Sequence, residues 1–162
     1  MMDTDDLAVE IGTALSGPAG SRFAVALAAV LRRFSAPIGT IHRLGDDGHL
    51  HLMAASEGLP PPVLEAARRI PLGKGIAGEA AQTGKPVTMC NLQTDRSGVA
   101  RPGAKATGAG GTLCVPVFLG DRVVGTLGIG YPSEHEFTPA ETEALIAAGR
   151  AMAEVLSSDK CA

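Results

Sequence analysis

The sequence predicts an α+β domain, in which helices from both ends of the chain pack on an antiparallel five- to six-stranded sheet. Three observations lead to this prediction. Residues 111–131 have the pattern of two strands joined by the tight turn Gly120-Asp121. Residues 37–56 show a second strand pair around Asp46-Asp47-Gly48. Residues 138–156 combine a helix start signal with apolar residues at helical spacing, which indicates a long closing helix.

The hairpin of residues 111–131 is expected to lie at the centre of the sheet. Its two-residue turn needs positive φ, which Gly120 adopts without strain, and the turn places Leu119 opposite Arg122. Counting back from the turn predicts one face with Leu113, Val115, Val117, Val124, Thr126 and Gly128, and another with Thr112, Cys114, Phe118, Val123, Leu127 and Ile129. Both faces are mostly apolar, so both must be covered. Helices are expected to cover one face and a ligand cavity is expected on the other.

Two helices are expected ahead of the first strand. Thr4 is placed to cap a short helix that Gly17-Pro18 ends, and Ser21 begins a second helix that runs to Phe34. The predicted division of the chain is an N-terminal helix and linker (1–20), a main domain (21–157) and a disordered tail (158–162).

The middle of the chain is predicted to alternate short elements. Residues 60–69 and 76–82 are expected as short helices, with residues 70–75 as a connection that contains glycine. Residues 86–90 are expected as an edge strand. Residues 91–110 are rich in Gly and Ala and show neither the helical nor the strand period, so this segment is expected to be a lid or disordered.

Composition restricts the classes of function. A chain of 162 residues is long enough to bury one core without disulfides or metals, and a formal net charge of −3 without a basic cluster argues against nucleic acid and anionic membranes as partners. No apolar run approaches the length that spans a bilayer. Three cysteines, Cys90, Cys114 and Cys161, form no metal-binding or CxxC pattern. These features predict a cytoplasmic protein.

Three segments together resemble a GAF domain. They are RIPLGKGIAGEAAQTGKPV (69–87), TLCVPVFLGDRVVGTLGIG (112–130) and FTPAETEALIAAGRAMAEVL (137–156). GAF domains are PAS-related modules for small-molecule sensing and dimerisation, found in phosphodiesterases, phytochromes, histidine kinases and transcriptional activators. The resemblance implies that the N- and C-terminal helices pack on one face of the sheet and that a ligand pocket lies on the other.

The resemblance also implies the position of the pocket. By similarity to cyclic-nucleotide-binding members, Thr40 and Ala77 line the pocket, and His42 shares the strand face of Thr40. The helix that starts near residue 76, after a segment rich in glycine, is expected to turn backbone N–H groups toward the pocket. The expected pocket residues are Thr40, His42, Ile76, Ala77, Gly78, Val115, Thr126 and Gly128. The alternative is that Gly73, Gly75 and Gly78 serve only a tight turn and close helix–sheet contact. The Asn-Lys pair and Asp of the cyclic-nucleotide subgroup are missing, so the ligand stays unknown and no cofactor is assigned.

Catalysis and metal binding are not predicted. The related free methionine-(R)-sulfoxide reductases place one cysteine where Ala77 stands and another in the loop before the central hairpin, where residues 91–111 contain none. His49 and His51 alternate on one strand face, but no third metal ligand accompanies them. Cys114 is expected to be a buried apolar thiol. Cys90 leaves a thiol redox protein as a weaker alternative.

The function predicted from the sequence is a stand-alone GAF-type sensor in signal transduction, which binds a small ligand between the sheet and residues 91–110. Its terminal helices are expected to form a homodimer and to pass the signal to a protein partner. The dimer expectation rests on a stripe of Leu7, Ile11 and Leu15 and on a wide apolar arc over residues 140–156, which packing within one chain would also explain. The competing prediction is a protein-interaction or dimerisation module whose pocket is filled by side chains.

Overall fold

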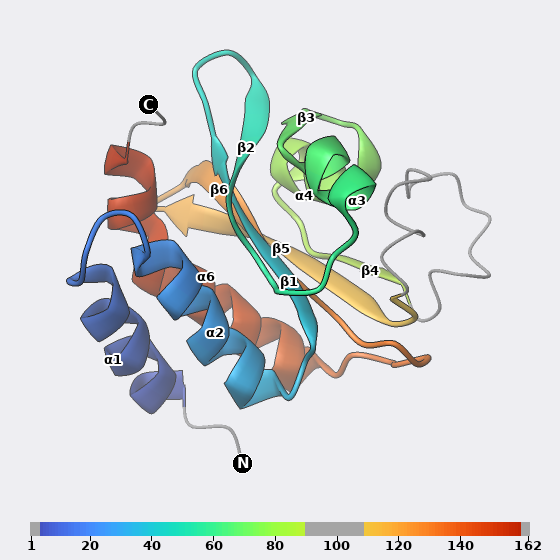
Figure 1. Ribbon diagram of the computed structural model, residues 1–162, viewed down its shortest axis with the longest axis horizontal. Coiled ribbons are helices and arrows are strands. Elements are labelled where there is room, and N and C mark those ends of the chain that lie inside the picture. Colours follow the sequence, from blue (N-terminus) through green and yellow to red (C-terminus); the bar gives the residue numbers. More distant parts are fainter. Residues whose placement is uncertain (1–3, 90–108, 160–162) are drawn as a thin grey trace.

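The structure, a computed structural model, describes residues 4–89 and 109–159 of the chain (Figure 1). Within these residues one antiparallel sheet has the strand order β3-β2-β1-β6-β5-β4. Its strands are β1 (Ile38–Leu44), β2 (His49–Ala55), β3 (Arg69–Pro71), β4 (Val87–Met89), β5 (Thr112–Leu119) and β6 (Arg122–Gly130). The central place of the β5–β6 hairpin and the α+β class are confirmed.

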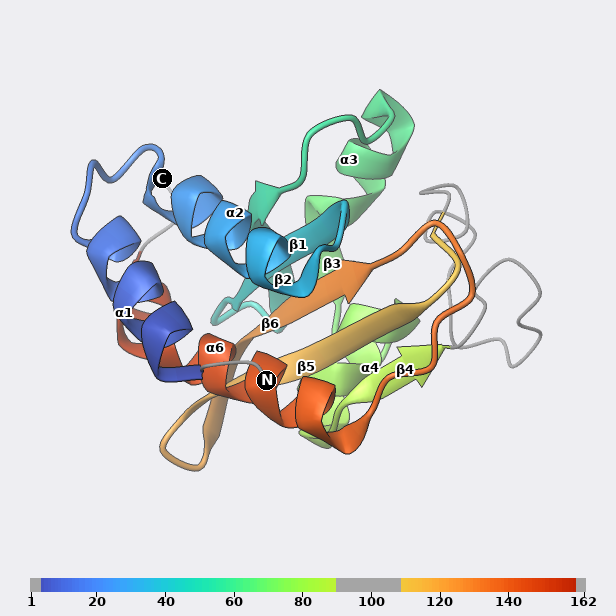
Figure 2. The same ribbon diagram turned by 90° about the horizontal axis from the view of Figure 1, so that it is seen from below.

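Helices cover the two faces of the sheet unequally. The helices are α1 (Thr4–Leu15), α2 (Arg22–Phe34), α3 (Pro61–Ala67), α4 (Gly75–Thr83) and α6 (Pro139–Ser158). The helices from the two ends of the chain, α1, α2 and α6, lie on one face, and α3 and α4 lie on the other (Figures 1 and 2). None of the helices in the described part of the chain is long and apolar enough to cross a membrane.

Helix α6 begins where the sequence predicts. Thr138 Oγ1 accepts a hydrogen bond from the Glu141 N–H at 3.1 Å, and the Thr138 N–H donates to Glu141 Oε1 at 2.9 Å. This reciprocal capping box satisfies two backbone donors at the helix start, and Pro139 needs no donor in the first turn. The local sequence alone is therefore enough to fix the start of α6.

The apolar stripes of the terminal helices lie inside the monomer. Leu7, Ile11 and Leu15 of α1 are all buried, as are Leu145, Ala148 and Met152 of α6, and all six belong to the main core under the sheet. The stripe of α1 is therefore not available for a partner chain, because α1 packs against α2 and α6 of the same chain. The observation that motivated a homodimer is explained by folding of one chain.

A bulge in the central hairpin changes the predicted register. Next to the Gly120 turn the pairs match the prediction, namely Leu119 with Arg122 and Phe118 with Val123. The register then shifts, so that Val117 lies opposite Gly125 and Val124 is the extra residue. Beyond Val124 every pairing differs from the predicted one by one residue.

The shift reverses the faces of β5. Leu113, Val115 and Val117, which were expected to face a cavity, lie in the core under α1, α2 and α6. Thr112 and Cys114, which were expected under the helices, lie on the opposite face. In β6 four expectations are correct, because Leu127 and Ile129 face the helices and Thr126 and Gly128 do not. The expectation for Val124 is wrong, because this residue lies in the main core.

Strand β3 is the element that sequence patterns missed. Its three residues are Arg69–Pro71. Arg69 was expected to end a short helix, and residues 70–71 were expected to belong to an irregular connection. The three residues pair with His49–His51 of β2 at one edge of the sheet. A three-residue edge strand is too short to show the alternation that identifies strands in sequence.

Candidate functional site

The strand register brings small and polar side chains together on the sheet face that α4 covers, here called the α4 face. Residues paired across neighbouring strands form rows, because side chains alternate along each strand. The rows are His42–Thr126–Pro116, Thr40–Gly128–Cys114–Val87 and Ile38–Gly130–Thr112–Met89. Polar groups thus surround glycines on a face that is otherwise apolar.

Gly128 lies at the middle of the α4 face with room above it. A Cβ atom there would lie 3.6 Å from Thr40 Oγ1 and 3.7 Å from Cys114 Sγ, which are ordinary contacts. A Cβ atom on Gly125 of the same strand would instead collide with the carbonyl oxygen of His42. Gly125 is required by close strand approach, whereas Gly128 leaves space for at least a methyl group.

The first turns of α4 lie over this face. A buried cluster joins Ile76 and Ala80 of α4 to Cys114 and Ala109, and Ala77 packs against it. Lys74, at the N-cap of α4, makes no side-chain hydrogen bond to the start of the helix. Among the described residues, the first backbone N–H groups of α4 therefore lack an N-cap side chain as an acceptor.

The three glycines before and within α4 have structural roles. Gly73 and Gly75 adopt φ of +80° and +69°, which other residues rarely adopt. A Cβ atom on Gly78 would lie 2.6 Å from the carbonyl oxygen of Pro71. The tight turn and close contact considered as the alternative account for all three, so Gly78 is a packing residue.

His42 is buried with one ring nitrogen in use. Its side chain is 1% exposed, and Nε2 lies 2.8 Å from the carbonyl oxygen of Ala67. A carbonyl oxygen can only accept, so Nε2 carries the hydrogen and Nδ1 is an acceptor. Burial lowers the pKa of His42 to about 4, against a smaller opposing effect of the Ala67 hydrogen bond. The ring is thus neutral near pH 7.

Three buried polar atoms on the α4 face lack a hydrogen-bond partner in the described part of the chain. They are His42 Nδ1, Thr112 Oγ1 and Thr126 Oγ1. Thr126 adjoins Cys114, whose sulfur is a weak acceptor that does not meet the geometry of a full hydrogen bond to the Thr126 hydroxyl. Burial raises the pKa of the Cys114 thiol to about 12, and the weaker effect of the Thr126 hydroxyl favours the thiolate. Cys114 is therefore a neutral, buried thiol, as expected. Groups of this kind on one face are unusual, because buried polar groups are normally paired.

The structure brings some of the predicted site residues together and separates others. Thr40, His42, Thr126 and Gly128 share the α4 face, and Ile76 and Ala77 lie over it. Val115 is wrong as a pocket residue, because it lies in the core under the terminal helices. Sequence reasoning missed that Thr112 and Cys114 lie on the α4 face. Their position depends on the bulge at Val124, which the sequence pattern does not show.

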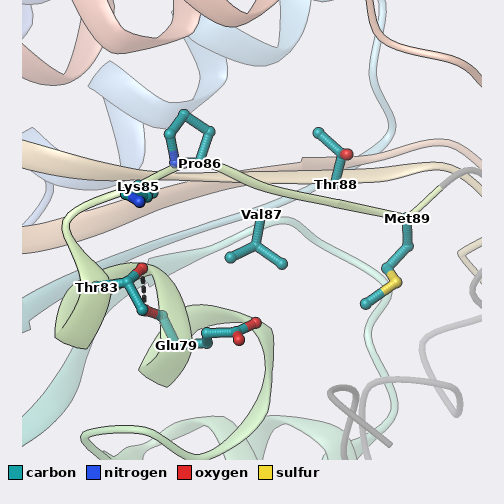
Figure 3. Close-up of a pocket in the computed structure, with 7 residues that line it drawn as sticks. All are labelled: Glu79, Thr83, Lys85, Pro86, Val87, Thr88 and Met89. Carbon is teal, nitrogen blue, oxygen red and sulfur yellow. Dashed lines mark hydrogen bonds between the residues drawn. The ribbon is translucent and has the colours of Figure 1, made fainter. Parts of the chain in front are cut away.

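An open groove of about 520 Å³ lies between the end of α4 and the edge strand β4. It is lined by Glu79, Thr83, Lys85, Pro86, Val87, Thr88 and Met89. In Figure 3 the Val87 side chain points toward α4, and Val87 and Met89 also pack against the cluster around Cys114. The groove therefore borders the α4 face at the sheet edge and does not lie over Gly128.

A chain of backbone contacts connects the α4 face to the start of α6. Ala109, which is buried in the cluster with Ile76 and Cys114, is followed by two glycines that bond to the loop after β6. The Gly110 N–H donates to the Tyr131 carbonyl oxygen at 2.6 Å, and the Gly111 N–H donates to that of Ser133 at 2.8 Å. In the same loop, His135 Nε2 lies 3.1 Å from Glu141 Oε2 of the α6 capping box.

The histidines of the β1–β2 hairpin are engaged in local contacts. His51 Nε2 donates to the Asp47 carboxylate at 3.0 Å, and Arg69 donates to the same group at 3.2 Å. These contacts, chiefly the one with His51, hold the pKa of Asp47 well below its usual range. No group of three potential metal ligands is found within residues 4–89 and 109–159. Cys90 and Cys161 lie outside the described residues.

Solved structures with this fold include both regulatory domains and enzymes. The GAF domain of a phosphoenolpyruvate-protein phosphotransferase from Acinetobacter has a TM-score of 0.75 at 19% identity, over 94% of this chain and 91% of that one. The corresponding domain from Coxiella burnetii gives a TM-score of 0.76 at 18% identity, over 94% and 92%. The free methionine-R-sulfoxide reductase from Neisseria meningitidis, in complex with its substrate, gives 0.73 at 16% identity, over 95% and 89%. At such identities the likeness shows the fold alone.

The family follows from the sequence match. A search among curated proteins gives no match. A family model described as GAF domain matches residues 22–157, which include every strand of the described sheet and helix α4. The chain belongs to the GAF domain family.

Proposed function

We propose that this GAF domain is a non-catalytic regulatory sensor that binds a small molecule between helix α4 and the α4 face of the sheet. The observation that carries the proposal is the set of unpartnered buried atoms on that face, His42 Nδ1, Thr112 Oγ1 and Thr126 Oγ1. Each such atom costs about 1–3 kcal/mol of folding free energy, and a ligand that supplies its partner offsets this cost. Residues 91–108 of the expected ligand cover lie outside the described residues, and Ala109 supports the expectation by its burial beside Ile76.

The proposed output of the sensor is a change at the start of α6. A ligand that displaces the cluster of Ile76 and Ala109 would also move the backbone of Gly110 and Gly111, which is bonded to the loop that leads into the α6 capping box. Ligand binding changes the output only by its preference between two arrangements of this connection.

Native mass spectrometry of protein purified from its own host, combined with Gly128→Leu, tests the binding proposal. The wild-type protein is expected to retain a small molecule. Gly128→Leu should lose this molecule while the melting temperature stays near the wild-type value, because a Cβ atom at Gly128 meets only ordinary contacts. Gly12→Leu on the exposed side of α1, where nothing lies within 4 Å of a Cβ atom, is the matched control. A wild-type protein that carries nothing, or a Gly128→Leu variant that unfolds, contradicts the proposal.

The second candidate function is a protein-interaction or dimerisation module. It is favoured by the cluster of Ile76, Ala80, Ala109 and Cys114, which fills part of the α4 face with side chains. A homodimer or a signalling partner would then need another surface. The large exposed apolar side chains in the described residues are Val9 of α1 and Val25 of α2, at 69% and 51% exposure. Sedimentation of wild type and of a Val9→Glu, Val25→Glu double variant distinguishes this module from a monomeric sensor.

The absence of catalysis is proposed from the cysteines. Ala77 replaces one cysteine expected of a free methionine-(R)-sulfoxide reductase, residues 91–111 contain no other, and the Cys114 thiol is protonated and buried. A thiol nucleophile must be accessible and ionised. Purified protein should therefore show no thiol-dependent reduction of free methionine sulfoxide, and turnover in that assay would contradict a non-catalytic role.

A further inference from the structure

The orphaned nitrogen of His42 has a defined hydrogen-bonding role. Because Nε2–H donates to the Ala67 carbonyl oxygen, Nδ1 presents a lone pair. This atom is buried and no donor reaches it from the described residues. Burial keeps the ring neutral near pH 7, since the pKa of His42 is lowered to about 4. The site therefore offers an acceptor that lacks a donor.

A residue with a hydroxyl group lies opposite His42. Thr126 is its direct partner in the β1–β6 pair, and the buried Thr126 Oγ1 has no hydrogen-bond partner in the described residues other than the weak acceptor Cys114 Sγ. Cα atoms of directly opposed residues in antiparallel strands are about 4.5–5.5 Å apart, so the two side chains emerge side by side on the same face. One can only accept, and the other can donate.

The rows around this pair carry no charged side chain. Thr40, Gly128 and Pro116 are uncharged, and the Cys114 thiol is protonated because burial raises its pKa to about 12. The remaining members of the three rows are Ile38, Val87, Met89, Thr112 and Gly130. A charged ligand group placed over these rows would lose its hydration without gaining an opposite charge.

We propose that the α4 face recognises an uncharged ligand with a primary amide or lactam group, whose N–H donates to His42 Nδ1 and whose carbonyl oxygen accepts from Thr126 Oγ1. Such a group carries its donor N–H and its acceptor oxygen on the same carbon and pointing the same way, which matches two opposed side chains. A carboxylate places an acceptor against His42 Nδ1, and an ammonium group finds no carboxylate in the three rows. This inference rests on the proposed sensor function and adds the chemical class of its ligand.

The test is an NMR titration with small probes of similar size, followed through the imidazole nitrogens of ¹⁵N-histidine-labelled protein. Propionamide and 2-pyrrolidinone are expected to shift the His42 Nδ1 resonance at concentrations up to about 100 mM, since so small a ligand binds weakly. Propionate and propylammonium should bind at least about tenfold more weakly at pH 7, because each must bury its charge. Equal or tighter binding of propionate, or no amide-induced shift, overturns the inference.

Variants of Thr126 show whether the predicted contact is the one used. Thr126→Val removes the hydroxyl and should weaken propionamide binding at least about fivefold, whereas Thr126→Ser keeps it and should bind like wild type. Thr13→Val on α1, where the hydroxyl bonds only to the Val9 carbonyl oxygen, is the remote control. Unchanged propionamide binding in Thr126→Val overturns the contact.

The outcomes also separate this inference from the sensor proposal. If the protein from its host retains a charged ligand, and Gly128→Leu abolishes the binding of that ligand, the sensor proposal stands and the amide inference is wrong. If the protein retains no ligand and no probe binds, both are wrong. A retained uncharged amide that Thr126→Val releases supports both.

Discussion

Gly111 and His135 touch so closely that no side chain fits between them. A Cβ atom on Gly111 would collide with Cβ of His135 and lie 2.8 Å from its backbone nitrogen. Here the segment just before β5 meets the loop that leads into α6. The Tyr131 N–H donates to the Gly111 carbonyl oxygen at 2.9 Å. The ring of His135 stacks on Tyr131 with 4.4 Å between centroids, and this holds the loop in place. The contact fixes the position of the connection between the α4 face and α6.

Gly111→Ala is expected to lower the free energy of unfolding by about 1–3 kcal/mol, because the backbone near His135 must move. Urea unfolding followed by circular dichroism measures the change. Gly12→Ala is the matched control, since nothing lies within 4 Å of a Cβ atom there and alanine favours a helix by about 0.5–1 kcal/mol over glycine. A Gly111→Ala variant as stable as wild type would show that the contact is not tight in solution.

Two glycines of β6 should respond differently to the same substitution. Gly128→Ala is expected to change stability by less than about 1 kcal/mol, because its Cβ atom would meet Thr40 and Cys114 at ordinary distances. Gly125→Ala should destabilise the protein by about 3 kcal/mol or more, because the Cβ atom collides with the His42 backbone. Melting temperatures of the two variants, compared side by side, check the prediction. Equal losses would mean that no space exists above Gly128.

The buried ring of His42 predicts a loss of stability in mild acid. The pKa of His42 is about 4 in the folded protein and 6.5 in the unfolded chain, so between these values the unfolded chain binds a proton that the folded protein does not. The free energy of unfolding should therefore fall as the pH drops from about 6.5 to about 4, by about 3 kcal/mol in total from this group. His42→Gln keeps a donor for Ala67 but does not titrate. Its stability should approach that of wild type across this window, and parallel curves for the two proteins would contradict the assignment.

Ala148→Glu is expected to unfold the monomer. Ala148 is 2% exposed and lies in the main core, so the substitution buries a charge with no partner. Ala140→Glu, at an exposed position in the first turn of α6, is the control and should retain the wild-type fold. Circular dichroism and sedimentation together make the measurement. If the wild-type protein is a dimer and Ala148→Glu is a folded monomer, the Leu145, Ala148 and Met152 stripe of α6 is a dimer contact and the prediction is wrong.

Elements whose signals are local could be predicted from residue types and their spacing. The Thr138–Glu141 capping box sets the start of α6, and the Gly120-Asp121 turn sets the first two pairs of the central hairpin. In both cases the interacting groups lie within a few residues of each other, so residue types and spacing are sufficient. The motifs of residues 69–87 and 112–130 also pointed to the family, and Thr40, His42, Thr126 and Gly128 were placed on one face before the fold was known.

The face of β5 that meets α4 depends on contacts between strands that are distant in the chain. The bulge at Val124 lies next to Gly125, which packs closely against the His42 backbone of β1, and no local pattern records this contact. One extra residue in a strand of period two exchanges the faces of its partner, so Val115 moved into the core and Cys114 onto the α4 face. For the same reason the apolar stripe of α1 does not reveal in the sequence whether α2 and α6 or a second chain covers it. Burial depends on what packs against a residue, and that is settled only when the distant elements come together.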